Sequence, residues 1–255
     1  MSAELEGRGV VITRPAHQSD ALAALIREHG GRPLLFPVIE IRDVEDTAAL
    51  DAIIRRLDDF DLAIFVSPNA VQKGWAAIHA RRSFPLRLAI ATIGRASARE
   101  LRQLGASHVI EPHEGTDSES LLAMPELEAV AGKRIVIFRG VGGRELLRET
   151  LEARGASVEY AECYRRMRSQ ADVASIAAAW GRGEIDAVVV TSSEGLRNLR
   201  EMLGDAARDH LARTPLFVPH SRIAATAREL GLTEVVVTGP GDESLANGLV
   251  GHFAS

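Results

Sequence analysis

The sequence has a single cysteine, Cys163, among its 255 residues. One cysteine excludes a disulfide within the chain and is typical of proteins from a reducing compartment, so we expect a cytoplasmic protein. Long apolar runs are also missing, since none approaches the roughly 18 residues of a membrane-spanning helix. The polar start MSAELEGRG does not have the pattern of a signal peptide. We therefore expect no membrane partner.

Basic residues do not dominate the composition. The chain has 30 Lys and Arg against 35 Asp and Glu, which gives a net charge of −5. This balance argues against nucleic acid as a partner, and any anionic ligand would need a local positive field. The length suits two domains of about 100–150 residues each.

Several cofactor and metal motifs are missing too. The run that starts at Gly140 fails the dinucleotide pattern G-x-G-x-x-G, because Glu145 occupies the place of the third glycine. Neither a phosphate-binding P-loop nor a nucleophile elbow G-x-S-x-G occurs. The eight histidines are not spaced as metal ligands, so we expect no metal site.

What the sequence does contain is an internal duplication. Arg14 and Arg139 are 125 residues apart, and so are Ser67 and Ser192. The segments around them match in order, for example DLAIFVSPNAV at 61–71 and DAVVVTSSEGL at 186–196. A nearly constant offset over several elements indicates a duplicated domain rather than an array of short repeats.

Each copy alternates short apolar runs with amphipathic segments. The expected strands are 9–13, 32–36, 62–66, 88–92, 108–110, 134–138, 157–160, 186–190, 215–218 and 234–238. The expected helices are 20–29, 47–57, 68–80, 95–104, 117–123, 143–153, 172–182, 194–203, 221–230 and 242–252. Fully apolar strands alternating with helices predict an α/β fold of two flavodoxin-like domains, each a parallel sheet with helices on both faces. The segment 36–41 contains Pro37, which disfavours a central strand, so we interpret it as a linker or an edge ladder.

Six turns follow strands at the edge where such sheets bind ligands, beyond the carboxyl ends of the strands. They lie at 13–15, 67–69, 92–94, 139–143, 191–194 and 219–222. Most of them precede a helix, whose free backbone N–H groups and positive dipole end suit carboxylates or phosphates. Small hydroxyl residues there allow close approach, although the same residues are also ordinary helix caps.

Individual polar residues at these positions allow two interpretations each. Arg14 and Arg139 occupy equivalent places and are either solvated charges or anion clamps. His220 is a helix cap, a solvated side chain or a proton donor. Tyr164, one of two tyrosines, either shields the linker or donates a proton, since a tyrosine hydroxyl is protonated at neutral pH. The neighbouring Arg166 is either solvated or a source of local positive charge.

An ordered set of motifs resembles the uroporphyrinogen-III synthase family. The motifs are VVITRP, FPVIEI, FVSPNAV, IGRASARELRQLG, IVIFRGVGGRELL, AECYRR, VVVTSSEGLRNL and HSRIAATARELG. Each motif is weakly specific, but their order and spacing cover nearly the whole chain. The resemblance implies two flavodoxin-like domains joined by a two-stranded β-ladder linker. It places 1–35 with 168–255 in one domain and 42–160 in the other, with 36–41 and 161–167 as the ladder.

The resemblance also implies a reaction. Members cyclise the linear tetrapyrrole hydroxymethylbilane to uroporphyrinogen III, with loss of water and inversion of ring D, in tetrapyrrole biosynthesis. The substrate carries eight carboxylates, which suits a cleft ringed by helix N-termini. No cofactor or metal is implied, and a monomer is expected.

Site residues follow from the turns and the resemblance together. Tyr164 matches the family's linker tyrosine, the candidate general acid. Ser97 stands where many members have threonine, so the hydroxyl is kept. The candidate substrate-binding residues are Arg14, Ser67, Asn69, Gly94, Ser97, Arg139, Gly140, Ser192, Ser193, His220 and Ser221.

Two other functions fit parts of the same pattern. A non-catalytic two-domain binder that closes on a small polyanion by hinge motion would use the same helix starts. A nucleotide-dependent transferase would need a phosphate loop or a ribose-binding acid, and the sequence offers neither convincingly.

Overall fold

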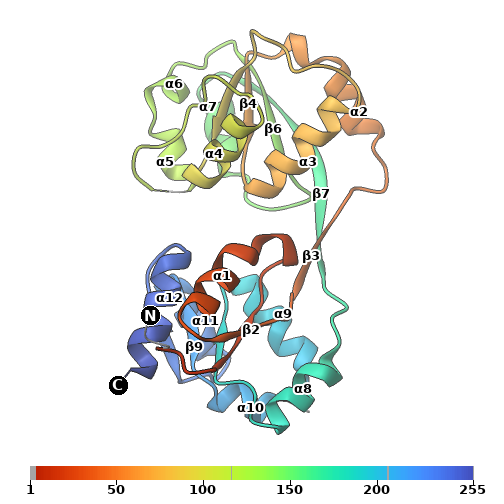
Figure 1. Cartoon of the computed structure of the whole chain (residues 1–255). Helices are drawn as coiled ribbons and strands as arrows, with labels where there is room; N and C mark the ends of the chain where they lie inside the picture. The colour runs from red at the N-terminus through yellow and green to blue at the C-terminus, as the bar shows by residue number, and fades with distance from the viewer. Residues whose placement is uncertain (1–3, 116, 206, 255) are drawn as a thin grey trace. The chain divides into compact units, whose positions relative to one another are not determined.

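The computed structural model describes residues 4–115, 117–205 and 207–254 (Figure 1). Residues 1–3, 116, 206 and 255 fall inside the predicted domain ranges but lie outside the described residues. The chain divides into two compact units. The first takes its residues from Met1–Glu40 and Met167–Ser255, and the second from Ile41–Arg166. The chain therefore passes twice from one unit to the other.

The first unit holds a five-stranded parallel sheet in the order β10-β9-β8-β1-β2. Its strands are β1 (Gly9–Ile12), β2 (Arg32–Leu35), β8 (Ala187–Val189), β9 (Leu216–Val218) and β10 (Val235–Val237). Renumbered by chain order, this is the 2-1-3-4-5 order of flavodoxin-like sheets. Pro33 lies in the edge strand β2, where its missing N–H is tolerated.

Helices cover this sheet because right-handed crossovers leave β1 and β8 in opposite directions along it. The helices are η1 (Ala16–Gln18), α1 (Asp20–Glu28), α8 (Val173–Gly181), α9 (Ser193–Leu203), α10 (Arg208–Arg213), α11 (Ser221–Glu229) and α12 (Asp242–Phe253). α1 packs beside α12, and α9 packs beside α11. The core under α1 and α12 contains Val10, Ile12 and Val189 from the strands.

The second unit repeats the arrangement and adds an edge strand, in the order β3-β7-β6-β4-β5 (Figure 1). Its strands are β3 (Ile39–Arg42), β4 (Leu62–Phe65), β5 (Ala89–Thr92), β6 (Arg134–Gly140) and β7 (Ser157–Arg168). Its helices are α2 (Ala48–Arg55), η2 (Leu57–Asp59), α3 (Pro68–His79), α4 (Arg95–Gln103), α5 (Ser118–Leu122), α6 (Pro125–Glu128) and α7 (Leu146–Ala153). Without β3, and with each strand numbered as its duplicate in the first unit, the second sheet again has the 2-1-3-4-5 order, with a single bridge from Ala91 to Ile110 at the far edge.

Successive side chains along the strands of this unit point to opposite faces of the sheet and pack into two separate hydrophobic cores. Phe65 and Phe138 stack at 4.6 Å between ring centroids, in the core that includes residues of α2, α3 and α4. Ile64 and Ile137 point to the opposite core, which includes residues of α5 and α7. The alternation follows from the two-residue period of a strand. It fixes the register, so the ends of β4 and β6 lie side by side.

Three details differ from the sequence-based expectations. The strand predicted at 108–110 is only the bridge at Ile110, because Pro112 follows closely and has no N–H to continue the ladder. In the predicted ladder, strand pairing beside β7 begins at Ile39 rather than at Phe36. Phe36 N–H instead donates to the Ile12 carbonyl at 3.0 Å, and so extends β2. The short helices α6 and α10 carry too few residues for a periodic signal.

Candidate functional site

The strand order gives each unit one topological switch point, where crossovers leave neighbouring strands in opposite directions. In the first unit it lies between β1 and β8, and in the second between β6 and β4. The ends of these four strands and the segments that follow them contain seven of the predicted site residues, Arg14, Ser67, Asn69, Arg139, Gly140, Ser192 and Ser193. They sit at the carboxyl edge, where open α/β sheets bind ligands.

Tyr164 lies at the switch point of the second unit. The pairing of β6 with β7 shifts between Arg139 and Gly140, so that Gly140 pairs with Tyr164 and Cys163 is passed over. This irregularity re-aims the tyrosine side chain over Gly140, where no Cβ stands in its way. The tyrosine is 0% exposed, and its Oη lies 3.1 Å from Ser67 Oγ.

Ser67 joins this tyrosine to the start of α3. It is the N-cap of the helix, its Oγ accepts a hydrogen bond from Ala70 N–H at 3.0 Å, and Pro68 fills the first helical position. Asn69, the next predicted residue, is buried in the first turn. The structure thus brings Tyr164, Ser67 and Gly140 together within one unit.

Arg166 completes this group. Its Nη2 donates a hydrogen bond to Tyr164 Oη at 3.2 Å, and its guanidinium carbon lies 5.6 Å from the centroid of the tyrosine ring. From the sequence we expect this arginine to be either solvated or a source of local positive charge. Its position was nevertheless readable, because residues 164 and 166 of an extended strand share one face.

Arg139 is held within its own loop. Its side chain is among the buried polar groups, its Nη1 pairs with Glu145 Oε1 at 3.0 Å, and its other nitrogens bond the carbonyls of Gly140 and Gly142. The guanidinium also stacks 4.3 Å from the centroid of the Tyr160 ring. In this structure the arginine organises the glycine-rich turn.

Glu145 closes the same network from the start of α7. It accepts a hydrogen bond from Tyr160 Oη at 2.8 Å. That bond, assisted by Arg139, lowers the pKa of Glu145, while burial and the carboxylate raise the pKa of Tyr160 to about 12. The residue that breaks the dinucleotide motif is therefore a structural partner of the loop.

The first unit builds its switch point differently. Ser192 caps α9 by accepting from Gly195 N–H at 2.9 Å, and Ser193 Oγ accepts from Thr226 Oγ1 at 2.9 Å. Arg14 pairs with Asp242, the first residue of α12, at 2.5 Å. The equivalent residues Arg14 and Arg139 thus have unrelated partners.

The remaining predicted residues occupy the flanking helix starts. Gly94 is the N-cap of α4, and Ser97 is buried in its first turn. His220 is the N-cap of α11, and Ser221 is its first residue, both exposed. Backbone N–H groups at these starts are available to an anion.

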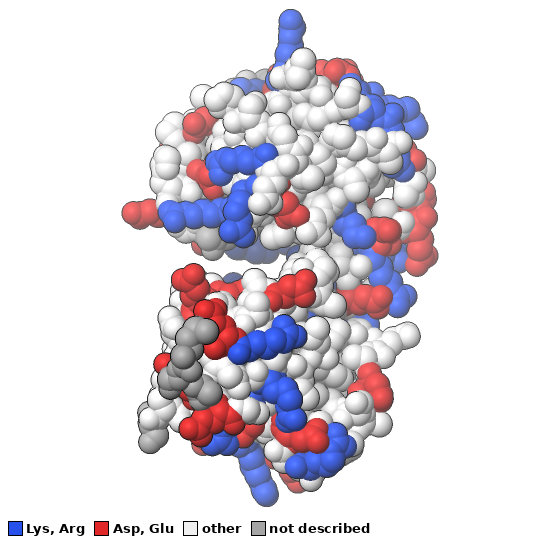
Figure 2. Space-filling model, viewed as in Figure 1, with Lys and Arg blue, Asp and Glu red and all other residues white. Residues whose placement is uncertain are grey.

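A basic hollow follows the outer face of α4. It has a volume of about 470 Å³ and is lined by Arg95, Ala96, Arg99, Arg102 and Glu111. Figure 2 shows basic side chains gathered over this helix. Arg95 donates to the His113 carbonyl at 2.8 Å and Arg102 pairs with Glu111 at 2.5 Å. The sequence signal was present, because the arginines recur at the spacing of one helical face.

Across residues 4–115, 117–205 and 207–254, no group of three or more His, Cys, Asp or Glu side chains is arranged to hold a metal ion. Over the same ranges, no helix combines the length and the apolarity that crossing a membrane requires.

The fold defines an α/β protein with parallel sheets, and comparisons with known proteins give its family. The profile of the family described as uroporphyrinogen-III synthase HemD matches residues 20–247. The uroporphyrinogen-III synthase of Escherichia coli is 35% identical over 91% of this chain and 96% of its own length. That of Salmonella typhimurium is 37% identical over the same shares. The chain belongs to the uroporphyrinogen-III synthase family, whose members are cyclising lyases of tetrapyrrole biosynthesis.

Solved structures agree on the fold. A uroporphyrinogen III synthase mutant from Thermus thermophilus has a TM-score of 0.60 at 22% identity and covers 96% of this chain and 97% of its own. The uroporphyrinogen-III synthetase of Helicobacter pylori has a TM-score of 0.59 at 13% identity and covers 94% and 97%. The family predicted from the ordered motifs is confirmed.

Proposed function

We propose that this chain cyclises hydroxymethylbilane to uroporphyrinogen III, with inversion of ring D and loss of water. The observation that carries the proposal is the hydrogen-bonded pair of the buried Tyr164 and the partly buried Ser67 at a switch point, in a member of this family. A phenol and a hydroxyl in this place suit proton donation to a leaving hydroxyl group.

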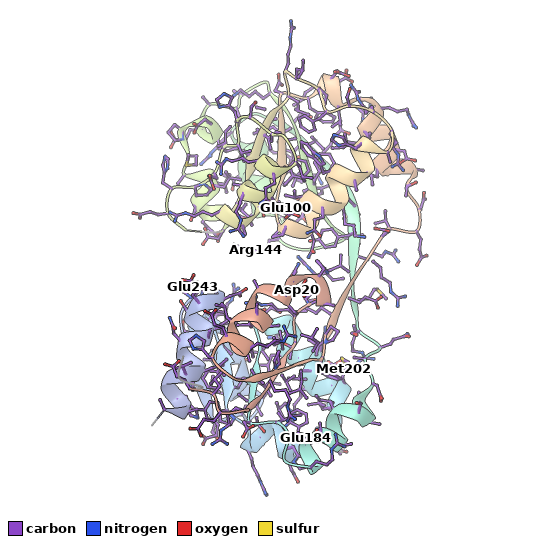
Figure 3. The ribbon with its side chains drawn as sticks, in the orientation of Figure 1. Asp20, Glu100, Arg144, Glu184, Met202 and Glu243 are labelled. Carbon is purple, nitrogen blue, oxygen red and sulfur yellow. The ribbon has the colours of Figure 1, made fainter. Side chains whose placement is uncertain are left out.

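Binding of a substrate with many carboxylates has to occur against a net charge of −5. Figure 3 shows Asp20 and Glu243 near the starts of α1 and α12, so those helix dipoles already face carboxylates of the protein. The first turns of α3, α4 and α11 contain no acidic residue. We assign substrate carboxylates to these three starts, beside Ser67, Gly94 and His220.

The arginines along α4 add the local field that the composition lacks. Arg99 has no hydrogen-bonding or ionic partner among the described residues, so its guanidinium remains open to a carboxylate. We propose that this helix carries part of the long-range attraction, which predicts weaker substrate binding at higher salt.

Conformational control is the main task of the site. Closure without the enzyme gives the uninverted type I isomer, so catalysis requires that one bound conformation be held while the hydroxyl departs. Positioning of this kind supplies several kcal/mol, and one general acid supplies roughly 10²–10⁴-fold in rate.

We propose the two domains and the ladder linker predicted above, with a monomer as the working form. Support comes from the two chain crossings near Glu40 and Arg166, and from β3 lying beside β7. Such paired crossings suit a hinge.

An isomer-resolved assay tests the function. Purified protein is supplied with hydroxymethylbilane without added cofactor, and the products are oxidised and separated as type I and type III porphyrins. We expect type III in excess over the spontaneous background. Type I alone from well-folded protein would reject the proposal, and tight binding without turnover would favour the non-catalytic polyanion binder.

A further inference from the structure

Three hydrogen bonds link four groups in a continuous chain behind the candidate site. Arg166 Nη2 lies 3.2 Å from Tyr164 Oη, which lies 3.1 Å from Ser67 Oγ, and that oxygen accepts from Ala70 N–H at 3.0 Å. The two ends of the chain are donors only, since neither a guanidinium nor a backbone N–H accepts a hydrogen bond. The two hydroxyl protons in the middle therefore decide its direction.

Counting protons leaves two arrangements. If Ser67 donates to Tyr164, the phenol proton has no acceptor, because no other partner of Tyr164 Oη occurs among the described residues. That arrangement leaves a donor unsatisfied on a side chain that is 0% exposed. If Tyr164 donates to Ser67, both bonds are made and the proton of Ser67 is free to point outward.

Arg166 favours the second arrangement. Its positive charge lies against the phenol oxygen, which makes that oxygen a poorer acceptor and its proton a better donor. Ser67 is only partly buried, whereas Tyr164 is enclosed. The group that can reach a ligand is the serine hydroxyl.

We propose that Ser67 hands the proton to the departing hydroxyl of the substrate, that Tyr164 replaces it, and that Arg166 is the positioning residue that sets this direction. The inference deepens the function proposed above and rests on it. The carbon–oxygen bond of the hydroxymethyl group breaks, and its oxygen leaves as water with the proton of Ser67. The proton of Tyr164 moves to Ser67, and the phenolate pairs with Arg166. When the ring closes, a pyrrole carbon loses one proton, which restores the phenol.

A double-mutant cycle tests the relay. Tyr164→Phe and Ser67→Ala are each expected to lower single-turnover formation of type III by about 10²-fold, and the double variant by about the same factor, because groups that act as a unit are non-additive. Ser67→Thr keeps a hydroxyl and should retain most of the rate. Ser67 also caps α3, so its replacement lowers stability as well. Asp172→Ala removes the side-chain cap of α8 and serves as the control for this effect. The rate of the Asp172→Ala variant should be unchanged.

The role of Arg166 is tested by removing its charge, by restoring a charge with lysine, and by repeating the change without the tyrosine hydroxyl. Arg166→Gln should lower the rate about tenfold or more, Arg166→Lys should recover part of it, and the loss should disappear in a Tyr164→Phe background. Arg165→Gln removes the same charge from the neighbouring exposed arginine, which faces Glu45 at 3.6 Å, and should have little effect.

The outcomes separate the relay from the function itself. A wild-type rate for Ser67→Ala beside a slow Tyr164→Phe would mean direct donation by the phenol and would overturn the relay. The relay would also be overturned if the rate loss of the Tyr164→Phe, Ser67→Ala double variant were the product of the two single losses. Equal rate losses for Arg165→Gln and Arg166→Gln would overturn it as well. Only type I from the wild-type protein would instead reject the proposed function.

Discussion

A single methyl group at Gly140 should displace the proposed acid without touching a polar atom. A Cβ built there lies 2.7 Å from Cε2 and 2.8 Å from Cζ of Tyr164. Carbon atoms in contact sit about 3.5–4.0 Å apart, so the ring of the Gly140→Ala variant has to move by about 0.7–1.3 Å. The ring is fully enclosed, and its hydroxyl already lies 3.1 Å from Ser67. A shift of that size breaks the bond to the serine.

We expect a loss of about 10²-fold in kcat for type III, the scale of a 1 Å misplacement. Overpacking should also lower the free energy of unfolding by about 1–3 kcal/mol. The assay is single-turnover product formation with isomer separation, together with urea unfolding of the same preparations. KM should change little, because no residue assigned to the carboxylates is altered.

Gly74→Ala is the matched control. Its Cβ would lie 2.8 Å from Phe138 Cδ1 and 3.1 Å from Phe65 Cε1, again against aromatic rings of the second unit. The stability loss should be smaller, since alanine gains about 1 kcal/mol over glycine within a helix. Activity should be kept. A normal kcat for Gly140→Ala, or an equal loss for Gly74→Ala, would refute the reasoning.

Three further outcomes are expected. The hydrogen bond from Tyr160 lowers the pKa of Glu145 below its ordinary 4.5, so its contribution to stability is present above that pH and is lost as the pH falls through the lowered value. Thermal melts of Glu145→Gln and wild type should therefore converge in acid, and a constant gap would contradict this. Ser192→Ala should lose about 1 kcal/mol in urea unfolding and Ser192→Asp much less, whereas equal stability of all three would deny the cap. Burial raises the pKa of Cys163 to about 12, so iodoacetamide at pH 8 should label it only in denaturant, and rapid labelling of the native protein would contradict its enclosure.

The duplication made the fold predictable. The repeated spacing of Ser67 and Ser192 requires equivalent elements, and the structure gives both units the same order of duplicated strands. Apolar runs marked the buried strands because both faces of a parallel sheet are covered. Edge elements were harder, since an edge needs few apolar residues, and the expected strand before Pro112 amounts to one bridge at Ile110.

The candidate site was only partly readable. Serine before proline predicts a helix cap at Ser67, and the structure has it. The enclosure of Tyr164 was not predictable, because it depends on a register shift beside Gly140 that strict alternation does not contain. The ion-pair partners of the duplicated arginines could not be predicted from the duplication either. Arg139 pairs with Glu145 in its own loop, whereas Arg14 pairs with Asp242 at the start of α12.

Hydrogen exchange with bound uroporphyrinogen III, under reducing conditions, most directly tests the proposal that substrate carboxylates bind at the starts of α3, α4 and α11. One ligand per chain should protect the loop and helix starts at 67–71, 94–98 and 139–146 of the second unit. The same ligand should protect 220–224 of the first unit, because substrate carboxylates are assigned to the start of α11 there as well as to the starts of α3 and α4. Calorimetry on the same samples should give a stoichiometry of one. Protection confined to a single unit, with the other unchanged at saturation, would contradict a substrate held by both.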